Sequence, residues 1–363
     1  MATVFFTGFP GFLGSELLPR VLERHAKGVT ATCLVQPKFV TLAKARAEEL
    51  ARSHPAVAGR IHLVEGDITR PDLGLGEAKE LKEETVEIFH LAAVYDLAVK
   101  RDLAMRVNLD GTRFTLDFAR ACPNLKRLQY VSTCYVSGRY AGAYTEYDLE
   151  KGQEFNNYYE ETKYLAEVEV QRRMREGLPT TIYRPAIVVG DSATGATQKY
   201  DGPYYMMQLL LRQPAMALMP MVGRPDRTRV NVVPRDYVVA AIAYLSGLEK
   251  SKGKVYQLCD PNALTVAQMV DTLARAVGKN VVRVPLPTTV ARNAISHVPG
   301  VYQLMKVPAE SLDYFVHPTF YTCNNALADL EGSGIRCPGF PEYAPKLVTF
   351  MKEHPEFGSA AMV

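Results

Sequence analysis

The sequence predicts an α/β fold: a Rossmann-type, doubly wound parallel sheet with a smaller C-terminal substrate lobe interleaved with it. Short apolar runs alternate with amphipathic stretches long enough for helices through the first half of the chain. A glycine-rich turn, TGFPGFLG, joins the first apolar run to the first amphipathic stretch. After about residue 190 the chain becomes rich in methionine, tyrosine and proline, which indicates a less regular second lobe.

The apolar runs are continuous rather than alternating, which is typical of strands buried on both faces. The predicted strands are 3–6 (TVFF), 31–35 (ATCLV), 61–64 (IHLV), 86–92 (VEIFHLA), 127–132 (RLQYVS), 180–185 (TTIYRP) and 255–258 (VYQL). The predicted helices are 15–25, 39–52, 103–121, 158–176 and 234–247. Strands separated by helices of this length indicate parallel neighbours joined by crossover helices.

The division into lobes follows the same change in composition. Residues 1–190, joined by 230–260, are predicted to form the dinucleotide-binding sheet and its helices. Residues 191–229 and 261–363 are predicted to form the substrate lobe. Within it, the methionine-rich run 203–222 fits two interpretations. It is either a packed helix and loop core or a surface that adapts to a long flexible chain.

Composition narrows the classes of function. The chain has 363 residues, of which 47% are hydrophobic and 22% charged, so it can bury a large core. Its net charge of +3 and interleaved basic and acidic residues predict no nucleic-acid binding. The six cysteines form no C-x-x-C pair, which predicts no metal site. No transmembrane run or secretory signal is recognisable, so a cytoplasmic location is expected.

The turn TGFPGFLG places Gly8, Gly11 and Gly14 between a strand and a helix, the context in which this spacing binds a dinucleotide. Gly8 permits the tight turn, Gly11 allows the pyrophosphate to approach the backbone, and Gly14 allows the helix to pack closely. The amide groups at the start of the helix would bind the pyrophosphate. The remaining residues expected to complete this cradle are Thr7, Phe12 and Leu13.

The second strand favours NADP(H) as the cofactor. Proteins that prefer NAD usually carry an acidic residue at the end of this strand, where it binds the ribose 2′-hydroxyl. Here no acidic residue occurs between Glu23 and Glu48, and the strand ends in Gln36 followed by Lys38. A lysine attracts a 2′-phosphate, whereas a carboxylate repels it.

Two later strand ends are expected to complete the cofactor site. Asp67 and Ile68 follow the third strand and would contact the adenine. The fourth strand ends in the sequence HLAA, and its small residues would allow the cofactor to lie close to the backbone. The residues expected there are Leu91, Ala92 and Ala93.

A helical segment, NNYYEETKYLAE, supplies the expected catalytic pair Tyr159 and Lys163. Four residues apart on a helix, their side chains share one face. The Lys163 ammonium group is expected to lower the pKa of the phenol and to donate a hydrogen bond to a ribose hydroxyl of the cofactor, so both residues are also expected to bind the cofactor. Tyr158 competes for the role but lies about 100° around the helix. Thr133, next to Ser132 at the end of the fifth strand, would help bind a substrate oxygen that gains negative charge.

Together, T-G-x-x-G-x-x-G, the strand-end Ser-Thr, Y-x-x-x-K and YRPAIVVGDSATG (183–195) resemble an extended short-chain dehydrogenase/reductase. The resemblance implies that Asn108 lies near the catalytic lysine, contributes to catalysis through a proton path and helps bind the cofactor. It also implies that Pro185 and Ile187 lie along the nicotinamide.

A more specific resemblance is to fatty acyl-CoA reductases and thioester reductase domains, the male sterility, NAD-binding branch. GDSATG, VNVVPRDYVVAAI (230–242) and YTCNNALADLEGSGIRCPGF (321–340) carry it. No carrier or adenylation domain is recognisable, so the expected protein acts alone, with an acyl carrier protein as an alternative source of substrate. This branch often has an arginine where the second strand here ends in Gln-Pro-Lys.

Three functions follow from these residues. The first is NADPH-dependent reduction of an acyl thioester to an aldehyde or alcohol. The second is reduction or dehydrogenation of an aldehyde, ketone or secondary alcohol at the same site. The third, a dinucleotide-sensing regulator without turnover, is disfavoured because such regulators typically lack the pair formed by Tyr159 and Lys163.

Overall fold

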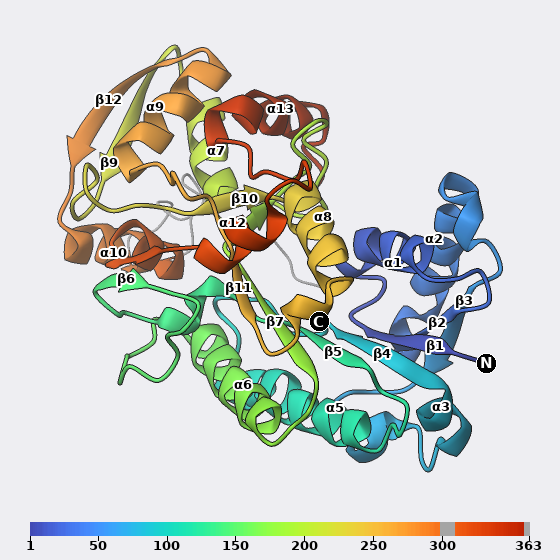
Figure 1. The fold of residues 1–363 in the computed structure, drawn as a ribbon. Coiled ribbons are helices and arrows are strands. Elements are labelled where there is room, and N and C mark those ends of the chain that lie inside the picture. The colour runs from blue at the N-terminus through green and yellow to red at the C-terminus, as the bar shows by residue number, and fades with distance from the viewer. Residues whose placement is uncertain (298–308, 359–363) are drawn as a thin grey trace.

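The computed structural model describes residues 1–297 and 309–358. Its centre is a seven-stranded parallel sheet with the order β11-β7-β5-β4-β1-β2-β3 (Figure 1). The strands are β1 (Thr3–Thr7), β2 (Thr30–Val35), β3 (Ile61–Glu65), β4 (Thr85–His90), β5 (Arg127–Val131), β7 (Thr180–Pro185) and β11 (Val255–Leu258). The predicted fold class and all seven predicted strands are therefore confirmed.

Helices cover both faces of the sheet, with α5 and α6 on one face and α1 and α8 on the other (Figure 1). The helices packed around this sheet are α1 (Gly14–Arg24), α2 (Val40–Ser53), α3 (Lys79–Glu84), α4 (Arg101–Ala104), α5 (Gly111–Arg120), α6 (Tyr158–Arg175) and α8 (Arg235–Ser246). Within β1, Phe6 packs with the α1 side and Phe5 with the α5 side. This alternation explains why the strand is apolar throughout.

The strand order reverses between β1 and β4, since the chain extends from β1 toward β3 on one side and from β4 toward β11 on the other. In doubly wound sheets, ligands bind at the carboxyl ends of the strands beside such a reversal. The glycine-rich turn follows β1 and the HLAA sequence ends β4. The topology therefore brings both predicted cofactor-binding segments to the same edge.

The second lobe contains α7 (Pro203–Arg212), β9 (Met216–Met221), α9 (Val266–Val277), β12 (Asn280–Pro285), α10 (Thr288–His297) and α13 (Phe340–Glu353). The methionine-rich run forms α7 and β9, and β9 pairs with β12 in parallel. Met207 and Met219 are buried in the apolar core that these elements share with α9 and α13. This packing agrees with the core interpretation of the run, although part of the same run also lines a cavity.

The lobes are interleaved through short strands. β6 (Gly142–Tyr144) pairs with β13 (Thr319–Tyr321), and β8 (Ile187–Val189) pairs with β10 (Val232–Pro234). α12 (Asn324–Leu330) packs on β11 and α8. Residues of α12 therefore belong to the core of the large sheet, although the sequence places them in the substrate lobe. The boundaries of the two lobes stay a prediction.

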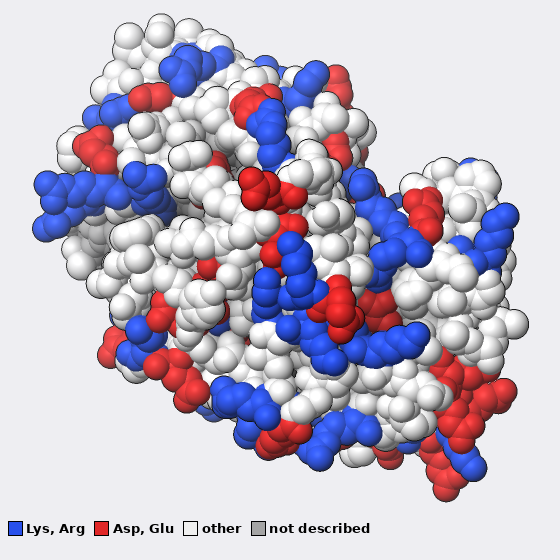
Figure 2. Space-filling view, in the orientation of Figure 1, with Lys and Arg blue, Asp and Glu red and all other residues white. Residues whose placement is uncertain are grey.

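Charges of both signs share the face shown in Figure 2, where Lys and Arg side chains are interspersed with Asp and Glu. The six cysteines carry free thiols, and Cys337 is the one that is partly exposed. Within residues 1–297 and 309–358, no helix is both long and apolar enough to cross a bilayer.

Candidate active site

A cleft of about 830 Å³ opens at the carboxyl ends of the strands, beside the reversal between β1 and β4. Its wall combines the strand-end loops with residues of the second lobe. All residues predicted to bind cofactor or act in catalysis line this cleft except Asn108: Thr7, Gly8, Gly11, Phe12, Leu13, Gly14, Gln36, Lys38, Asp67, Ile68, Leu91, Ala92, Ala93, Thr133, Tyr159, Lys163, Pro185 and Ile187.

The glycine turn has room for backbone only. Gly8 has a φ of +90°, and a Cβ there would lie 2.8 Å from the backbone nitrogen of Ala92. A Cβ on Gly11 or Gly14 would lie 2.7 or 2.5 Å from the Gly8 carbonyl oxygen. Glycine at position 11 was predicted to allow the pyrophosphate to approach the backbone. The turn itself already requires glycine there, because a Cβ would clash with the Gly8 carbonyl. α1 starts directly after this turn, and Leu13 at its N-cap provides no side-chain cap. These features fit the pyrophosphate of a dinucleotide.

The predicted adenosine side of the cleft carries both acidic and basic groups. The Asp67 carboxylate accepts a hydrogen bond from the Thr69 backbone N–H at 2.8 Å. Burial acts to raise the pKa of Asp67, but the hydrogen bonds from Thr69 and Gln36 and the charge of Arg70 hold it below its ordinary value. Arg70 also lines the cleft, and the sequence analysis did not single it out. Its place three residues after Asp67, in the same strand-end loop, was the available signal.

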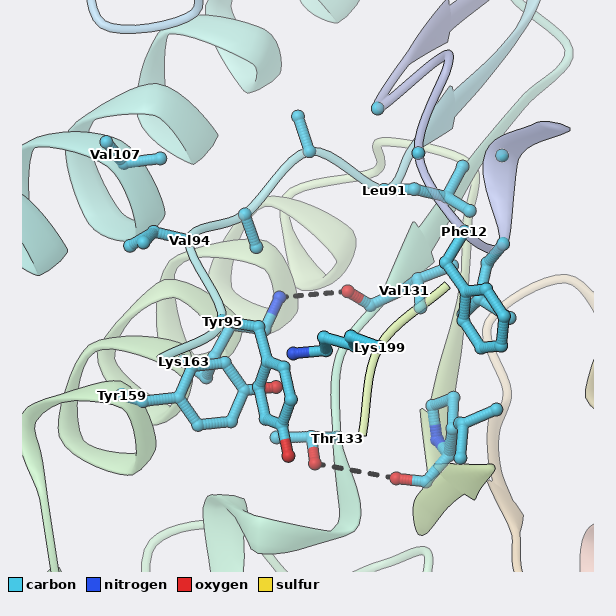
Figure 3. A pocket seen from close by; sticks show the side chains of 18 of the residues that line it. Phe12, Leu91, Val94, Tyr95, Val107, Val131, Thr133, Tyr159, Lys163 and Lys199 are labelled. Carbon is cyan, nitrogen blue, oxygen red and sulfur yellow. Dashed lines mark hydrogen bonds between the residues drawn. The ribbon is translucent and has the colours of Figure 1, made fainter. Parts of the chain in front are cut away.

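Three of the four residues predicted to be catalytic, Thr133, Tyr159 and Lys163, meet in the cleft (Figure 3). Tyr159 and Lys163 lie on α6, whose first turn is capped by the Asn157 side chain. Thr133 follows β5, and its hydroxyl accepts from the Tyr135 backbone N–H at 3.2 Å. All three are nearly buried, with exposed fractions of 9%, 4% and 5% for Tyr159, Lys163 and Thr133.

Lys163 is turned toward the end of β5. Its Nζ donates to the Val131 carbonyl at 2.9 Å (Figure 3) and to the Tyr130 hydroxyl at 3.2 Å. Burial lowers the pKa of Lys163 to about 8, while the nearby Glu167 acts in the opposite direction. That Lys163 lowers the pKa of the Tyr159 phenol stays a prediction. Burial raises the pKa of Tyr159 above its ordinary value, and a hydrogen bond with Thr133 offsets only part of the increase.

A buried ion pair fixes the helix that carries Lys163. Glu167, one turn further along α6, pairs with Arg184 of β7 at 2.6 Å, and both side chains are fully buried. The Ser132 hydroxyl donates to Glu167 at 2.5 Å. Of the two strand-end hydroxyls, that of Ser132 is therefore bound to α6, whereas Thr133 lies beside Tyr159.

Asn108 contacts α6 one residue before Lys163, but it does not line the cleft. It lies in a π-helical segment, Met105–Asp110, and is almost fully buried. Its side chain accepts from the Val94 backbone N–H at 2.8 Å and donates to the Val94 carbonyl at 3.2 Å and to Thr162 at 3.1 Å. The predicted cofactor contact and proton path of Asn108 stay predictions. In this structure the Asn108 side chain holds the loop after β4 against α6.

Several cleft residues come from segments that sequence reasoning did not connect with the site. The Tyr95 ring packs edge-on against Tyr159, with centroids 4.9 Å apart. Lys199 lies over the Tyr95 ring at 3.9 Å and forms an ion pair with Asp201 at 2.6 Å. Figure 3 shows Tyr95 and Lys199 next to Tyr159 and Lys163. No local pattern marks them, because their proximity depends on how the second lobe packs over the sheet.

Comparisons with known proteins identify the family. A sequence profile described as Male sterility protein matches residues 6–242. A linear gramicidin synthase from Brevibacillus parabrevis is 29% identical over 269 residues, which are 71% of this chain and 5% of that protein. Fatty acyl-CoA reductase wat from Drosophila melanogaster is 26% identical over 279 residues, which are 66% of this chain and 53% of that protein. The chain thus spans only part of the length of these curated relatives.

A solved structure supports the same assignment. The terminal R domain from the myxalamid PKS-NRPS biosynthetic pathway has a TM-score of 0.80 and 27% identity, covering 98% of this chain and 91% of that domain. The family match covers most of the sheet and the residues predicted to be catalytic, and it agrees with this likeness. The chain belongs to the male sterility protein family and has the fold of the extended short-chain dehydrogenases/reductases.

Proposed function

We propose that this protein is an NADPH-dependent reductase of acyl thioesters that yields an aldehyde or alcohol. The observation that carries the proposal is the meeting of Thr133, Tyr159 and Lys163 in the cleft that also contains the glycine cradle. The fatty acyl-CoA reductase and the R domain among its relatives support the thioester as substrate. Coenzyme A or an acyl carrier protein would supply the thiol.

The cofactor preference rests on charge. Lys38 and Arg70 line the predicted adenosine side of the cleft, and Gln36 at the end of β2 is neutral. Two cations favour a 2′-phosphate, since opposite charges attract strongly at short range. The residues around Gly8 would hold the pyrophosphate, and Pro185 and Ile187 would contact the nicotinamide.

The protein side chains act on the substrate oxygen. When bound, NADPH would supply the hydride that reduces the thioester carbonyl. Tyr159 donates its phenolic proton to the developing oxyanion, and Thr133 donates a hydrogen bond to the same oxygen. The charge on Lys163 stabilises the phenolate that remains. Release of thiol leaves the aldehyde, and a second reduction gives the alcohol.

The test measures oxidation of NADPH and NADH against matched acyl-CoAs, acyl carrier protein thioesters and aldehydes, with free thiol followed in parallel. We expect thiol release, a preference for NADPH, and a loss of about 10²–10⁴ in kcat for Tyr159→Phe. Tyr158→Phe is the matched control, because Tyr158 is 46% exposed and does not line the cleft. Reduction of aldehydes alone, without thiol release, would replace the proposal with a simple carbonyl reductase.

A further inference from the structure

A series of three contacts leads from the second lobe to Tyr159. The Lys199 Nζ forms an ion pair with the Asp201 carboxylate at 2.6 Å and lies 3.9 Å from the centroid of the Tyr95 ring. The Tyr95 ring packs edge-on against Tyr159, with the centroids 4.9 Å apart and the ring planes at 76°. Figure 3 shows the Lys199 side chain pointing toward the Tyr95 ring, beside Tyr159. All four residues line the cleft.

The contact between Lys199 and Tyr95 is unusually close. Among residues 1–297 and 309–358, every other distance between a cation and a ring centroid is 4.7 Å or more. The Lys199 side chain is 26% exposed, so its ammonium is largely removed from water, which strengthens its attraction to the face of the ring. The edge-on geometry of Tyr95 and Tyr159 is also a favoured arrangement of two aromatic rings.

The segment that carries Lys199 is anchored in the second lobe. The next residue, Tyr200, is buried, and its hydroxyl donates to the His354 carbonyl at 2.8 Å. The Tyr200 backbone N–H donates to the Gly358 carbonyl, also at 2.8 Å. The Thr197 hydroxyl donates to the Lys199 carbonyl at 3.2 Å. The backbone on both sides of the Lys199 side chain is therefore held in place.

Tyr95 is held from the side of the sheet. The backbone N–H and carbonyl of its neighbour Val94 are both bound by the Asn108 side chain. Tyr159 packs in a small apolar cluster with Val94 and Val99, and the Tyr95 ring packs against this cluster. The Tyr95 ring therefore connects the anchored segment of the second lobe with the phenol on α6.

We propose that Lys199 and Tyr95 are positioning residues that hold the Tyr159 phenol in the orientation from which it donates its proton. The inference rests on the proposed function, in which Tyr159 is the proton donor. Proton donation requires the phenol to lie within hydrogen-bond reach of the substrate oxygen, and a small displacement slows the reaction. Lys199 acts on the ring of Tyr95, and that ring acts on Tyr159, so the second lobe takes part in catalysis as well as enclosing the cleft.

The first experiment removes the charge of Lys199 and keeps the length of its side chain. Lys199→Met should lower kcat about tenfold and leave the KM of the thioester unchanged, because the contact acts on the transition state and not on substrate binding. Lys199→Arg keeps a cation over the ring and should recover most of the loss. A wild-type kcat in Lys199→Met, or an equal loss in Lys199→Arg, would overturn the inference.

Lys151→Met is the matched control. Lys151 also pairs with an aspartate, Asp148, at 2.9 Å and lies over a tyrosine ring, that of Tyr140, at 5.4 Å. It does not line the cleft, so its loss should leave kcat and KM at the wild-type values. A loss of kcat in Lys151→Met equal to that in Lys199→Met would show that the effect is not specific to the cleft and would overturn the inference.

The second experiment tests whether Lys199 acts through Tyr95. Tyr95→Leu removes the ring and should lower kcat about as much as Lys199→Met, whereas Tyr95→Phe keeps the ring and should lose less. Adding Lys199→Met to Tyr95→Leu should cause no further loss, because the ring on which the lysine acts is already absent. A second loss of about tenfold in the double variant would mean that Lys199 acts by another route, and the inference would be wrong. If Tyr95→Leu does not fold, Tyr95→Met removes the ring with a smaller loss of volume.

The inference and the proposed function fail separately. Denaturant unfolding of the single and double variants Lys199→Met, Tyr95→Leu and Tyr159→Leu measures whether Lys199 is coupled to Tyr95 and Tyr95 to Tyr159. Additive changes in the free energy of unfolding for either pair would overturn the inference, even if thioesters are reduced. If both pairs are coupled and no thioester is reduced, the proposed function fails, and the contacts that hold Tyr159 are supported.

Discussion

Gly8 is the residue in the cleft where the backbone conformation most restricts the side chain. Its positive φ and its approach to the backbone of Leu91 and Ala92 leave no space for a Cβ. Any larger residue must move either the turn or the end of β4. Both segments are predicted to contact the dinucleotide. A larger residue at position 8 should therefore weaken both the stability of the fold and the binding of the cofactor.

Gly8→Ala should lower the free energy of unfolding by about 1–3 kcal/mol and weaken NADPH binding by about tenfold or more. Denaturant unfolding and NADPH fluorescence titration measure the two effects. Gly28→Ala is the control, because Gly28 has no positive φ and no heavy atom within 4 Å of an added Cβ. If Gly8→Ala and Gly28→Ala had the same free energy of unfolding and the same affinity for NADPH, the turn would accept a Cβ at position 8, and the prediction would be wrong.

The lowered pKa of Lys163 predicts how the rate of reduction depends on pH. Its pKa is lowered to about 8 by burial, whereas burial raises the pKa of Tyr159. In the proposed mechanism, reduction requires the protonated phenol of Tyr159 and the charged ammonium of Lys163. Below about pH 8 both protons are present, and above it Lys163 loses its proton first. kcat/KM for reduction should therefore decrease as the pH rises through 8.

Lys163→Arg separates this effect from other titrations, because a guanidinium stays charged throughout the range. The variant should be slower, since Arg cannot reproduce the contacts of a lysine Nζ. Its decrease in kcat/KM should move to higher pH. A decrease at the same pH in both proteins would assign it to a group other than Lys163. The profiles are measured with NADPH and thioester below saturation.

At the scale of an element, α6 is held to the sheet by a charge pair that water does not reach. Arg184 donates to Glu167 through Nε and through an NH₂ group, and it also donates to the Asp148 carbonyl. Loss of one partner leaves a buried charge uncompensated, which is the costly way to break such a pair. Lys163 and Tyr159 share this helix, so its position affects the catalytic geometry.

Glu167→Gln should lower the free energy of unfolding by about 3–5 kcal/mol, measured by denaturant unfolding at neutral pH. Glu161→Gln is the control on the same helix, because Glu161 pairs with Arg101, which is 50% exposed. An exposed pair contributes about 1 kcal/mol or less. A loss of the same small size in both variants would contradict a structural role for the buried pair.

At the scale of the whole molecule, the chain returns from the second lobe to the sheet through α12. The Asp329 carboxylate accepts hydrogen bonds from Lys254 and Tyr256, each at 2.6 Å, and so joins α12 to β11 and its preceding loop. Burial opposes ionisation, but these contacts and Lys250 lower the pKa of Asp329 to about 2. Since the carboxylate is favoured in the folded state, its contribution is full above about pH 4 and is lost as the pH falls toward 2.

Asp329→Asn should lower the free energy of unfolding at pH 7 by about 1–3 kcal/mol. The difference from the wild type should shrink as the pH falls from 4 toward 2, where the wild-type carboxyl becomes protonated. Asp271→Asn is the control, since Asp271 pairs with Arg283 at an exposed position and should contribute little. If the difference in free energy of unfolding between Asp329→Asn and the wild type did not change with pH, the charge of Asp329 would not stabilise the packing of α12 on the sheet.

Local patterns predicted the sheet, its strand ends and 18 of the 46 residues that line the cleft. Continuous apolar runs identify buried strands, and the parallel topology brings their carboxyl ends to one edge. The glycines of TGFPGFLG and the four-residue spacing of Tyr159 and Lys163 are equally local, because each depends on a single turn or helix. These features were recoverable from a few consecutive residues.

Other features depend on contacts between segments far apart in the chain. The pattern around Asn108 could not show that its amide turns to Val94 and Thr162. The sequence at the end of β5 likewise could not show that the Ser132 hydroxyl turns to Glu167 of α6. These choices depend on burial and on the supply of hydrogen-bond partners, which exist only after the helices pack on the sheet.

The sequence by itself determined the α/β class, the glycine cradle and the Thr-Tyr-Lys group, because each depends on the spacing of a few nearby residues or on the pattern of apolar residues. Only the tertiary structure decided that Tyr95 and Lys199 join the catalytic cleft and that α12 packs on the sheet. The physical reason is that the packing of irregular segments depends on many contacts between residues far apart in the chain. A short stretch of sequence contains too few of these residues to predict the contacts.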